Sequence, residues 1–235
     1  MCRSMFCAIP CFWRVWDEKA RDKMLLFLPV VGLETGAIWA LLAWLCRYLA
    51  LPALVQGAVL GAYPFVVTGF IHLDGFMDVT DAVRSCRDLA RRREILKDSH
   101  VGSFAVIGVV LLALCQTALF ASAKTAASLW TLVLLPAVSR CGSALSVTAL
   151  RPMSTSQYAA QKKSHIIVLC AQLAVYLAAG FLAGWRTGAA LCGCLAGYAL
   201  ALRKAFRSLD GMNGDISGYA LTLFELCGAV VWALI

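Results

Sequence analysis

The chain has 235 residues, of which 61% are hydrophobic and only 14% are charged, and its mean hydropathy is +0.79. Soluble domains average about 25% charged residues, so this composition excludes an ordinary soluble protein and indicates an integral membrane protein. The net charge of +8 is spread over several loops, so we expect the lipid bilayer as a partner and no nucleic acid. No linker-like tract or repeat divides the sequence, and we expect a single transmembrane helical domain over residues 1 to 235.

Seven apolar segments are long enough to cross the hydrocarbon core, which needs about 20 residues per helix. In chain order they cover residues 24 to 46, 52 to 73, 101 to 123, 126 to 150, 165 to 183, 187 to 203 and 216 to 235. The sequence therefore predicts an all-α, polytopic integral membrane protein with about seven transmembrane helices.

The positions of Lys and Arg predict the orientation, because basic residues accumulate in cytoplasmic loops. With seven spans and a cytoplasmic N-terminus, 17 of the 21 basic residues and 11 of the 13 acidic residues fall on the cytoplasmic side. We therefore expect a protein of the cell (inner or plasma) membrane whose polar loops, and any active site on them, face the cytoplasm.

Residues 71 to 102, between the second and third predicted spans, are the most densely charged part of the chain, with six carboxylates and six Lys or Arg residues. Asp74, Asp78 and Asp81 are spaced i, i+4 and i+7, so on a helix all three would project from one face and repel one another. No basic residue lies between Ile71 and Val83 to balance them. Mg²⁺ prefers carboxylate oxygens, and the spacing favours a magnesium site here.

The second half of this stretch, residues 84 to 97, alternates acidic and basic residues. An ordinary solvated connector accounts for that pattern, for example through an i,i+4 pair of Asp88 and Arg92. We favour such a connector, whose arginines chiefly fix the orientation of the chain.

Three charged residues fall inside predicted spans, at Glu34, Arg140 and Glu225. A charge in hydrocarbon is costly, so each is expected to face a helix interface or a wet cavity and to find a partner. A pair of Arg140 with Glu225 is the first expectation, and either a structural ion pair or a contact to substrate would explain it.

The segment DGMNGDISG, residues 210 to 218, precedes the last predicted span. It combines three glycines with two aspartates and an asparagine. Taken alone it is also typical of a turn, with Asp215 or Ser217 as the helix N-cap.

Four ordered blocks form a more specific pattern, and they read GFIHLDGFMDVTDAV, EILKDSHVGSF, AVSRCGSAL and NGDISGYALTLFE, after FCAIP and FLPVVGLETG near the beginning. In order and separation they resemble the cobalamin (5'-phosphate) synthase family, the adenosylcobinamide-GDP ribazoletransferases, along nearly the whole chain. The resemblance implies a Mg²⁺-dependent enzyme that joins adenosylcobinamide-GDP to α-ribazole or its 5'-phosphate and releases GMP. This chemistry is phosphoryl transfer to an alcohol, which depends on alignment and charge neutralisation.

The resemblance also implies roles for individual residues. The expected Mg²⁺ ligands are Asp74, Asp78 and Asp81. The expected catalytic residues are Asp98, Arg140, Asp215 and Glu225. The expected substrate contacts are His72, Lys97, Arg140, Lys162, Lys163 and Asn213. Asp98 would be a further metal ligand or the general base, and Arg140 would lie beside the pyrophosphate or the departing GMP. Asp215 and Glu225 would approach the metal site from the last helix, or hold the architecture.

The chain departs from the family pattern at three positions of interest. His100 stands where arginine is usual, Thr222 where a glutamate is common, and Glu34 where the residue is usually apolar. These departures affect the expected substrate contacts more than the family resemblance.

Two other classes of function share some of these features. A CDP-alcohol phosphotransferase also uses membrane aspartates and a metal, but its aspartate pattern is absent here because Phe76 and Met77 follow Asp74 and Gly75. An ion-coupled transporter would explain the charges inside the spans, but not the clustered aspartates at the cytoplasmic edge. The sequence leaves the oligomeric state open, including a homo-oligomer.

Overall fold

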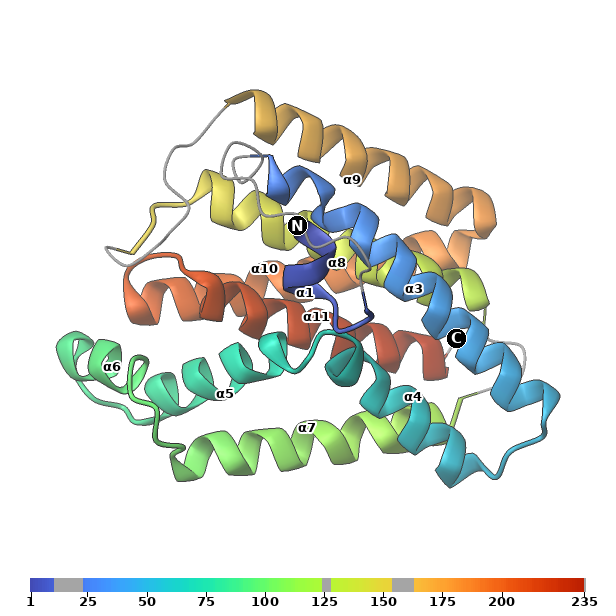
Figure 1. Ribbon diagram of the computed structural model, residues 1–235, viewed down its shortest axis with the longest axis horizontal. Helices are drawn as coiled ribbons and strands as arrows, with labels where there is room; N and C mark the ends of the chain where they lie inside the picture. Colours follow the sequence, from blue (N-terminus) through green and yellow to red (C-terminus); the bar gives the residue numbers. More distant parts are fainter. Residues whose placement is uncertain (11–22, 124–127, 154–162, 235) are drawn as a thin grey trace.

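The computed structural model describes residues 1–10, 23–123, 128–153 and 163–234 (Figure 1). The helices are α1 (Cys2–Phe6), α3 (Met24–Tyr48), α4 (Ala53–Val67), α5 (Ile71–Arg84), α6 (Leu89–Ile95), α7 (Ser103–Ala121), α8 (Leu129–Ala149), α9 (Lys163–Ala183), α10 (Trp185–Leu209) and α11 (Gly214–Leu234). Within the described ranges there is no β-strand, apart from an isolated bridge between Pro152 and Met212. The all-α prediction is confirmed.

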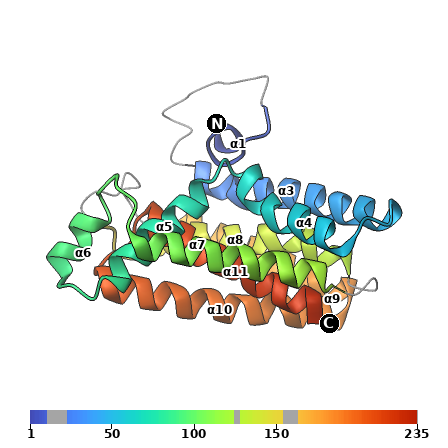
Figure 2. The same cartoon turned by 90° about the horizontal axis from the view of Figure 1, so that it is seen from below.

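In the part of the chain that the structure describes, six helices, α3 and α7 to α11, are long and apolar enough to cross a membrane, and α4 with α5 make a seventh if the bent pair is one span. The polytopic prediction is therefore confirmed. These helices run roughly along the longest axis of the molecule, with α6 at one end and the C-terminus at the other (Figures 1 and 2). The most buried of them are α8 and α11, which form the centre of the bundle.

The second predicted span, residues 52 to 73, is not one helix. α4 ends at Val67, and α5 begins at Ile71 and runs at an angle of 90° to α4. Gly69 and Phe70 take φ values of +60° and +65°, the left-handed conformation in which a helix commonly ends. A glycine adopts it without steric cost, and the apolar composition of the segment concealed the break.

The backbone groups freed by this break have partners, as they must in a lipid environment. Thr68 Oγ1 donates to the carbonyls of Pro64 and Phe65, at 2.9 and 3.2 Å. The N-terminal segment supplies another partner, because the Ala8 N–H donates to the Val67 carbonyl at 2.8 Å. Figure 2 shows α1 on the outer side of α3, close to this break.

The connector at residues 84 to 97 is also more ordered than predicted. Asp88 does not pair with Arg92 but caps α6, where its Oδ1 accepts from the Arg91 N–H at 3.0 Å. Arg92 and Arg93 instead donate to backbone carbonyls at the end of α10, to Ser208 at 3.3 Å and Leu209 at 3.0 Å. Cations suit a helix C-terminus, and these contacts hold α6 against the bundle.

Candidate active site

The three aspartates of the LDGFMD segment lie on α5, as the spacing predicted. Asp74 is exposed, and Asp78 and Asp81 are half-buried. α5 packs on the beginning of α11, where Gly75 meets the Asp215 backbone, and the charges of Asp74, Asp215 and Asp81 all act on Asp78. None of these four carboxylates forms an ion pair with a described residue. Asp78 thus lies near three other carboxylates, and none of the four is balanced by an ion pair with a described residue.

Two glycines let α5 and α11 approach closely enough to form this group. A Cβ at Gly75 would lie 2.8 Å from the Asp215 carbonyl oxygen and 2.9 Å from its Cα. One at Gly218 would lie 3.1 Å from the His72 carbonyl oxygen. The backbone of each helix thus rests on a glycine of the other, which fixes Asp215 opposite the α5 aspartates.

Asn213 organises the start of α11. Its Oδ1 accepts from the Ile216 N–H at 3.0 Å, so the N-cap is Asn213 and not Asp215 or Ser217. Its Nδ2 donates to Asp215 Oδ2 at 2.7 Å. Asn213, an expected substrate contact, therefore holds the Asp215 carboxylate in place. Ser217 bonds Ser143 of α8 at 2.6 Å.

The loop before α7 covers the other end of the aspartate face. Gly102 packs directly on the Asp81 carboxylate, which a Cβ at that position would overlap. In the same loop Asp98 is exposed, and its Oδ1 accepts from the His100 N–H at 3.0 Å and lies 2.7 Å from His100 Nδ1. The backbone N–H and then the ring of His100 hold the pKa of Asp98 below its usual range. A lowered pKa makes the Asp98 carboxylate a weaker proton acceptor, which suits a metal ligand better than a general base.

The expected Mg²⁺ can be compared with this donor set. Within the described ranges, no three His, Cys, Asp or Glu side chains converge into a metal-binding group made of protein ligands alone. Mg²⁺ does not require such a group, because it keeps several waters and commonly takes one or two carboxylates together with substrate phosphates. The α5 aspartates, which form no ion pair with a described residue, could supply one or two such carboxylates.

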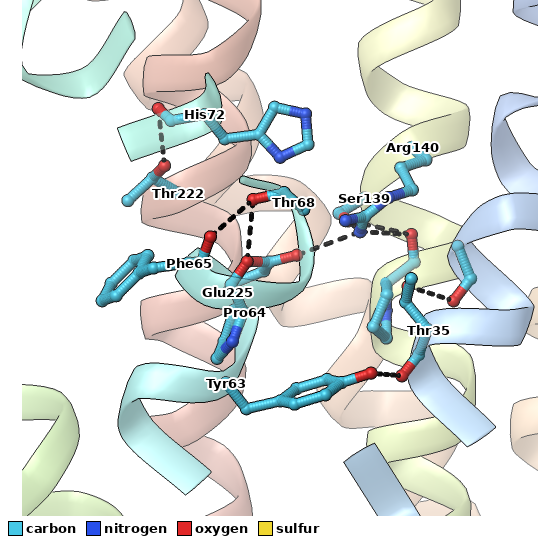
Figure 3. Close-up of polar contacts among 12 residues, drawn as sticks. Thr35, Tyr63, Pro64, Phe65, Thr68, His72, Ser139, Arg140, Thr222 and Glu225 are labelled. Carbon is cyan, nitrogen blue, oxygen red and sulfur yellow. Dashed lines mark hydrogen bonds and ion pairs between the residues drawn. The ribbon is translucent and has the colours of Figure 1, made fainter. Parts of the chain in front are cut away.

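Arg140 and Glu225 form the expected ion pair, deep in the bundle (Figure 3). Arg140 Nη1 lies 3.1 Å from Glu225 Oε1, and the side chains are 1% and 4% exposed. Gly32 makes room for the arginine, since a Cβ there would lie 2.8 Å from Arg140 Cδ. Glu225 is ten residues beyond Asp215 on α11, a rise of about 15 Å. This distance fits a structural role for Glu225 better than contact with the α5 aspartates.

His72 lies at the break, on the first turn of α5. Its ring points toward the side of the bundle that holds Arg140 and Glu225, as Figure 3 shows. The buried Nδ1 atom has no hydrogen-bond partner among the described residues. Thr222, which stands where the family often has a glutamate, donates to the His72 carbonyl at 3.2 Å. This hydrogen bond ties α11 to the first turn of α5.

The third intramembrane charge, Glu34, is explained by the N-terminal helix. Arg3 Nη2 of α1 lies 2.9 Å from Glu34 Oε1, and both side chains are more than one third exposed. The carboxylate is therefore paired with a residue of the N-terminal segment.

The three expected lysine contacts are less constrained. Lys97 is exposed on the loop after α6, and neither it nor Lys163 forms an ion pair with a described residue. Lys163 is the first residue of α9, which packs on α8, α10 and α3. Lys162 lies outside the described residues.

Sequence reasoning missed the glycines that assemble the site. Gly75 and Gly218 carry no chemistry, and their importance depends on the helix that faces them. One signal was available, since a glycine adjoins the aspartate in both Asp74-Gly75 and Gly214-Asp215. Glycine inside a helix is unfavourable unless close packing requires it.

Comparison with known proteins identifies the family of the chain. The family model described as cobalamin-5-phosphate synthase matches residues 1–233. Adenosylcobinamide-GDP ribazoletransferase of Clostridium perfringens (strain 13 / Type A) is 34% identical, over 100% of this chain and 96% of its own. The enzyme of that name from Clostridium botulinum (strain Alaska E43 / Type E3) is 32% identical, over 97% and 93%. No solved structure is a significant match. On the full-length match, the chain is a member of the cobalamin-5-phosphate synthase family.

Proposed function

We propose that this chain is an adenosylcobinamide-GDP ribazoletransferase, a membrane enzyme that joins adenosylcobinamide-GDP to α-ribazole or α-ribazole 5'-phosphate. The products are adenosylcobalamin, or its 5'-phosphate, and GMP. The observation that carries the proposal is that Gly75 packs the aspartate-bearing helix α5 onto α11 at Asp215, in a chain whose residues 1–233 match the family model.

In this reaction the 3'-hydroxyl oxygen of ribazole bonds to the phosphorus attached to cobinamide. The bond from that phosphorus to the bridging oxygen breaks, and GMP leaves with the oxygen and the electron pair. The hydroxyl proton passes to a base, for which the carboxylates of the site are the candidates. The tasks for the protein are alignment of the two substrates and compensation of negative charge.

Asp74, Asp78 and Asp81 are the proposed holders of Mg²⁺, with Asp215 opposite them. When bound, the metal would neutralise charge on the pyrophosphate, which aspartates alone would repel. The chain's own residues set the positions. Gly75 brings α5 onto α11, and Asn213 holds the Asp215 carboxylate. Asp98, ionised beside His100, is proposed as a further ligand at the edge of the site.

The site is proposed to face the cytoplasm. Six basic residues between Arg84 and Lys97 lie at the α6 end of the molecule, and the end of α10, which contacts α6, adds Arg203, Lys204 and Arg207. Such a concentration is expected of the inner side. The phosphorylated, water-soluble substrates would reach the carboxylates from that side.

The test is turnover by the purified protein in detergent, given adenosylcobinamide-GDP, α-ribazole 5'-phosphate and Mg²⁺. We expect GMP and a corrinoid product in equal amounts. Absence of GMP above the level of a protein-free control would reject the enzyme assignment. A transporter would leave the nucleotide intact. The charges that favoured that alternative are all paired, Arg140 with Glu225 and Glu34 with Arg3.

A further inference from the structure

A polar pocket lies at the α6 end of the molecule, between the end of α5, α6 and the beginning of α7. Its volume is about 600 Å³, and it is lined by Asp81, Arg87, Asp88, Arg91 and Ser103, among others. Small-molecule sites commonly measure about 300–1,000 Å³, so the pocket is large enough for a nucleotide. Because Asp81 belongs to both, the pocket adjoins the aspartate face.

The arginines of this region separate into two groups by what they contact. Arg92 and Arg93 are engaged with backbone carbonyls of α10 and hold α6 in place. Arg87 and Arg91 line the pocket instead. The Arg87 guanidinium forms no ion pair with a described residue, and one nitrogen of Arg91 bonds Glu94 at 2.7 Å while its other donors stay available. Two guanidinium groups therefore offer unused donors to the pocket.

The two acidic residues of the pocket, Asp88 and Asp81, are engaged elsewhere and do not pair with these guanidinium groups. Asp88 Oδ1 is occupied by the Arg91 N–H that it caps. Asp81 lies under Gly102 and belongs to the proposed metal ligands. A phosphate between Asp81 and the arginines would meet a metal on one side and guanidinium groups on the other. Guanidinium groups pair well with phosphates and stabilise charge that develops on them.

We propose, on the basis of the function proposed above, that this pocket binds the GMP half of adenosylcobinamide-GDP through its phosphate. Arg87 and Arg91 are the binding residues, and they stabilise the charge that GMP acquires when the bridging P–O bond breaks. The basic stretch after α5 is thus part of the substrate site as well as an orientation signal.

The test is GMP binding to the full-length protein in detergent, measured by calorimetry, with guanosine as a ligand that lacks the phosphate. We expect Arg87→Gln and Arg91→Gln each to weaken GMP binding at least about tenfold, since a hydrogen bond to a charged group is worth about 1.5–3 kcal/mol and 1.4 kcal/mol is tenfold. Arg203→Gln is the matched control, because it removes the same charge from an exposed position on α10. The affinity for guanosine should be the same in all of them.

A second control separates the phosphate contact from the Arg91–Glu94 ion pair. Glu94→Gln removes the pair but keeps the guanidinium, and it should bind GMP like the wild type. The proposal is wrong if Arg87→Gln retains wild-type affinity, or if Arg203→Gln loses as much as the pocket variants. Turnover by the wild type tests the enzyme assignment separately, because GMP binding decides the pocket whether or not cobalamin is formed.

Discussion

The contact between Gly75 and Asp215 gives the sharpest prediction about the site. In Gly75→Ala the added methyl would lie 2.8 Å from the Asp215 carbonyl oxygen, about 0.6 Å inside the 3.4 Å at which ordinary contact begins. The neighbour is helix backbone and cannot rotate away, so α5 and α11 must separate. Overpacking of this kind costs about 1–3 kcal/mol. A displacement approaching 1 Å at reacting groups costs on the order of 100-fold in rate.

The matched control is Gly193→Ala on α10, where a Cβ would meet no atom within 4 Å. Both changes replace a helical glycine by alanine. That replacement by itself stabilises the helix by about 0.5–1 kcal/mol. The control should therefore unfold at the same or a slightly higher temperature in detergent and keep its rate of GMP release. Gly75→Ala should unfold at a lower temperature and lose about 100-fold in that rate.

Gly218→Ala examines the same interface with a milder overlap, 3.1 Å from the His72 carbonyl oxygen. It keeps the prediction testable if Gly75→Ala does not fold. Its rate should fall between those of the control and Gly75→Ala. If Gly75→Ala and Gly218→Ala matched the control in rate and unfolding temperature, close packing of α5 on α11 would not position the aspartates.

Three further predictions concern the metal, the buried pair and the orientation. Asp74→Asn and Asp78→Asn should each abolish GMP release while the protein stays folded in detergent, as judged by its elution in size-exclusion chromatography. Near-normal rates across a magnesium titration would show that these residues do not bind the metal. Arg140→Met should lower the free energy of unfolding by about 3–5 kcal/mol, measured by thermal unfolding, because it leaves the Glu225 charge buried alone. Adding Glu225→Leu should recover most of that loss, and no recovery would mean that the two residues are not coupled. A topology reporter fused after Ile235 should be detected outside the cell, and a cytoplasmic signal would require an even number of spans.

The sequence predicted the long helices well because each satisfies a simple length and composition rule. It also predicted the helical face of Asp74, Asp78 and Asp81, because i, i+4 and i+7 spacing has one consequence on a helix. The pair of Arg140 and Glu225 followed from the cost of isolated charge in a membrane. Each of these inferences uses information that is local or purely compositional.

The break at Gly69 and the role of Arg92 could not be predicted in the same way. An apolar segment of helical length reads as one span, and the partner that the Val67 carbonyl finds at the break, the Ala8 N–H, is far away in sequence. Arg92 was assigned to a neighbour four residues away because local pairing is the usual rule. Its partner, the Ser208 carbonyl, is brought near only by the packing of α6 on α10.

The break in the second span determines where the aspartates can lie. A straight helix from Ala53 to Arg84 would follow one line through the bundle, whereas the 90° turn gives α5 a direction independent of α4. That freedom lets α5 settle with Gly75 on the backbone of α11 and its acidic face beside Asp215. The turn is stable because its backbone groups are bonded by Thr68 and the N-terminal segment, so elements with no chemical role determine the geometry of the site.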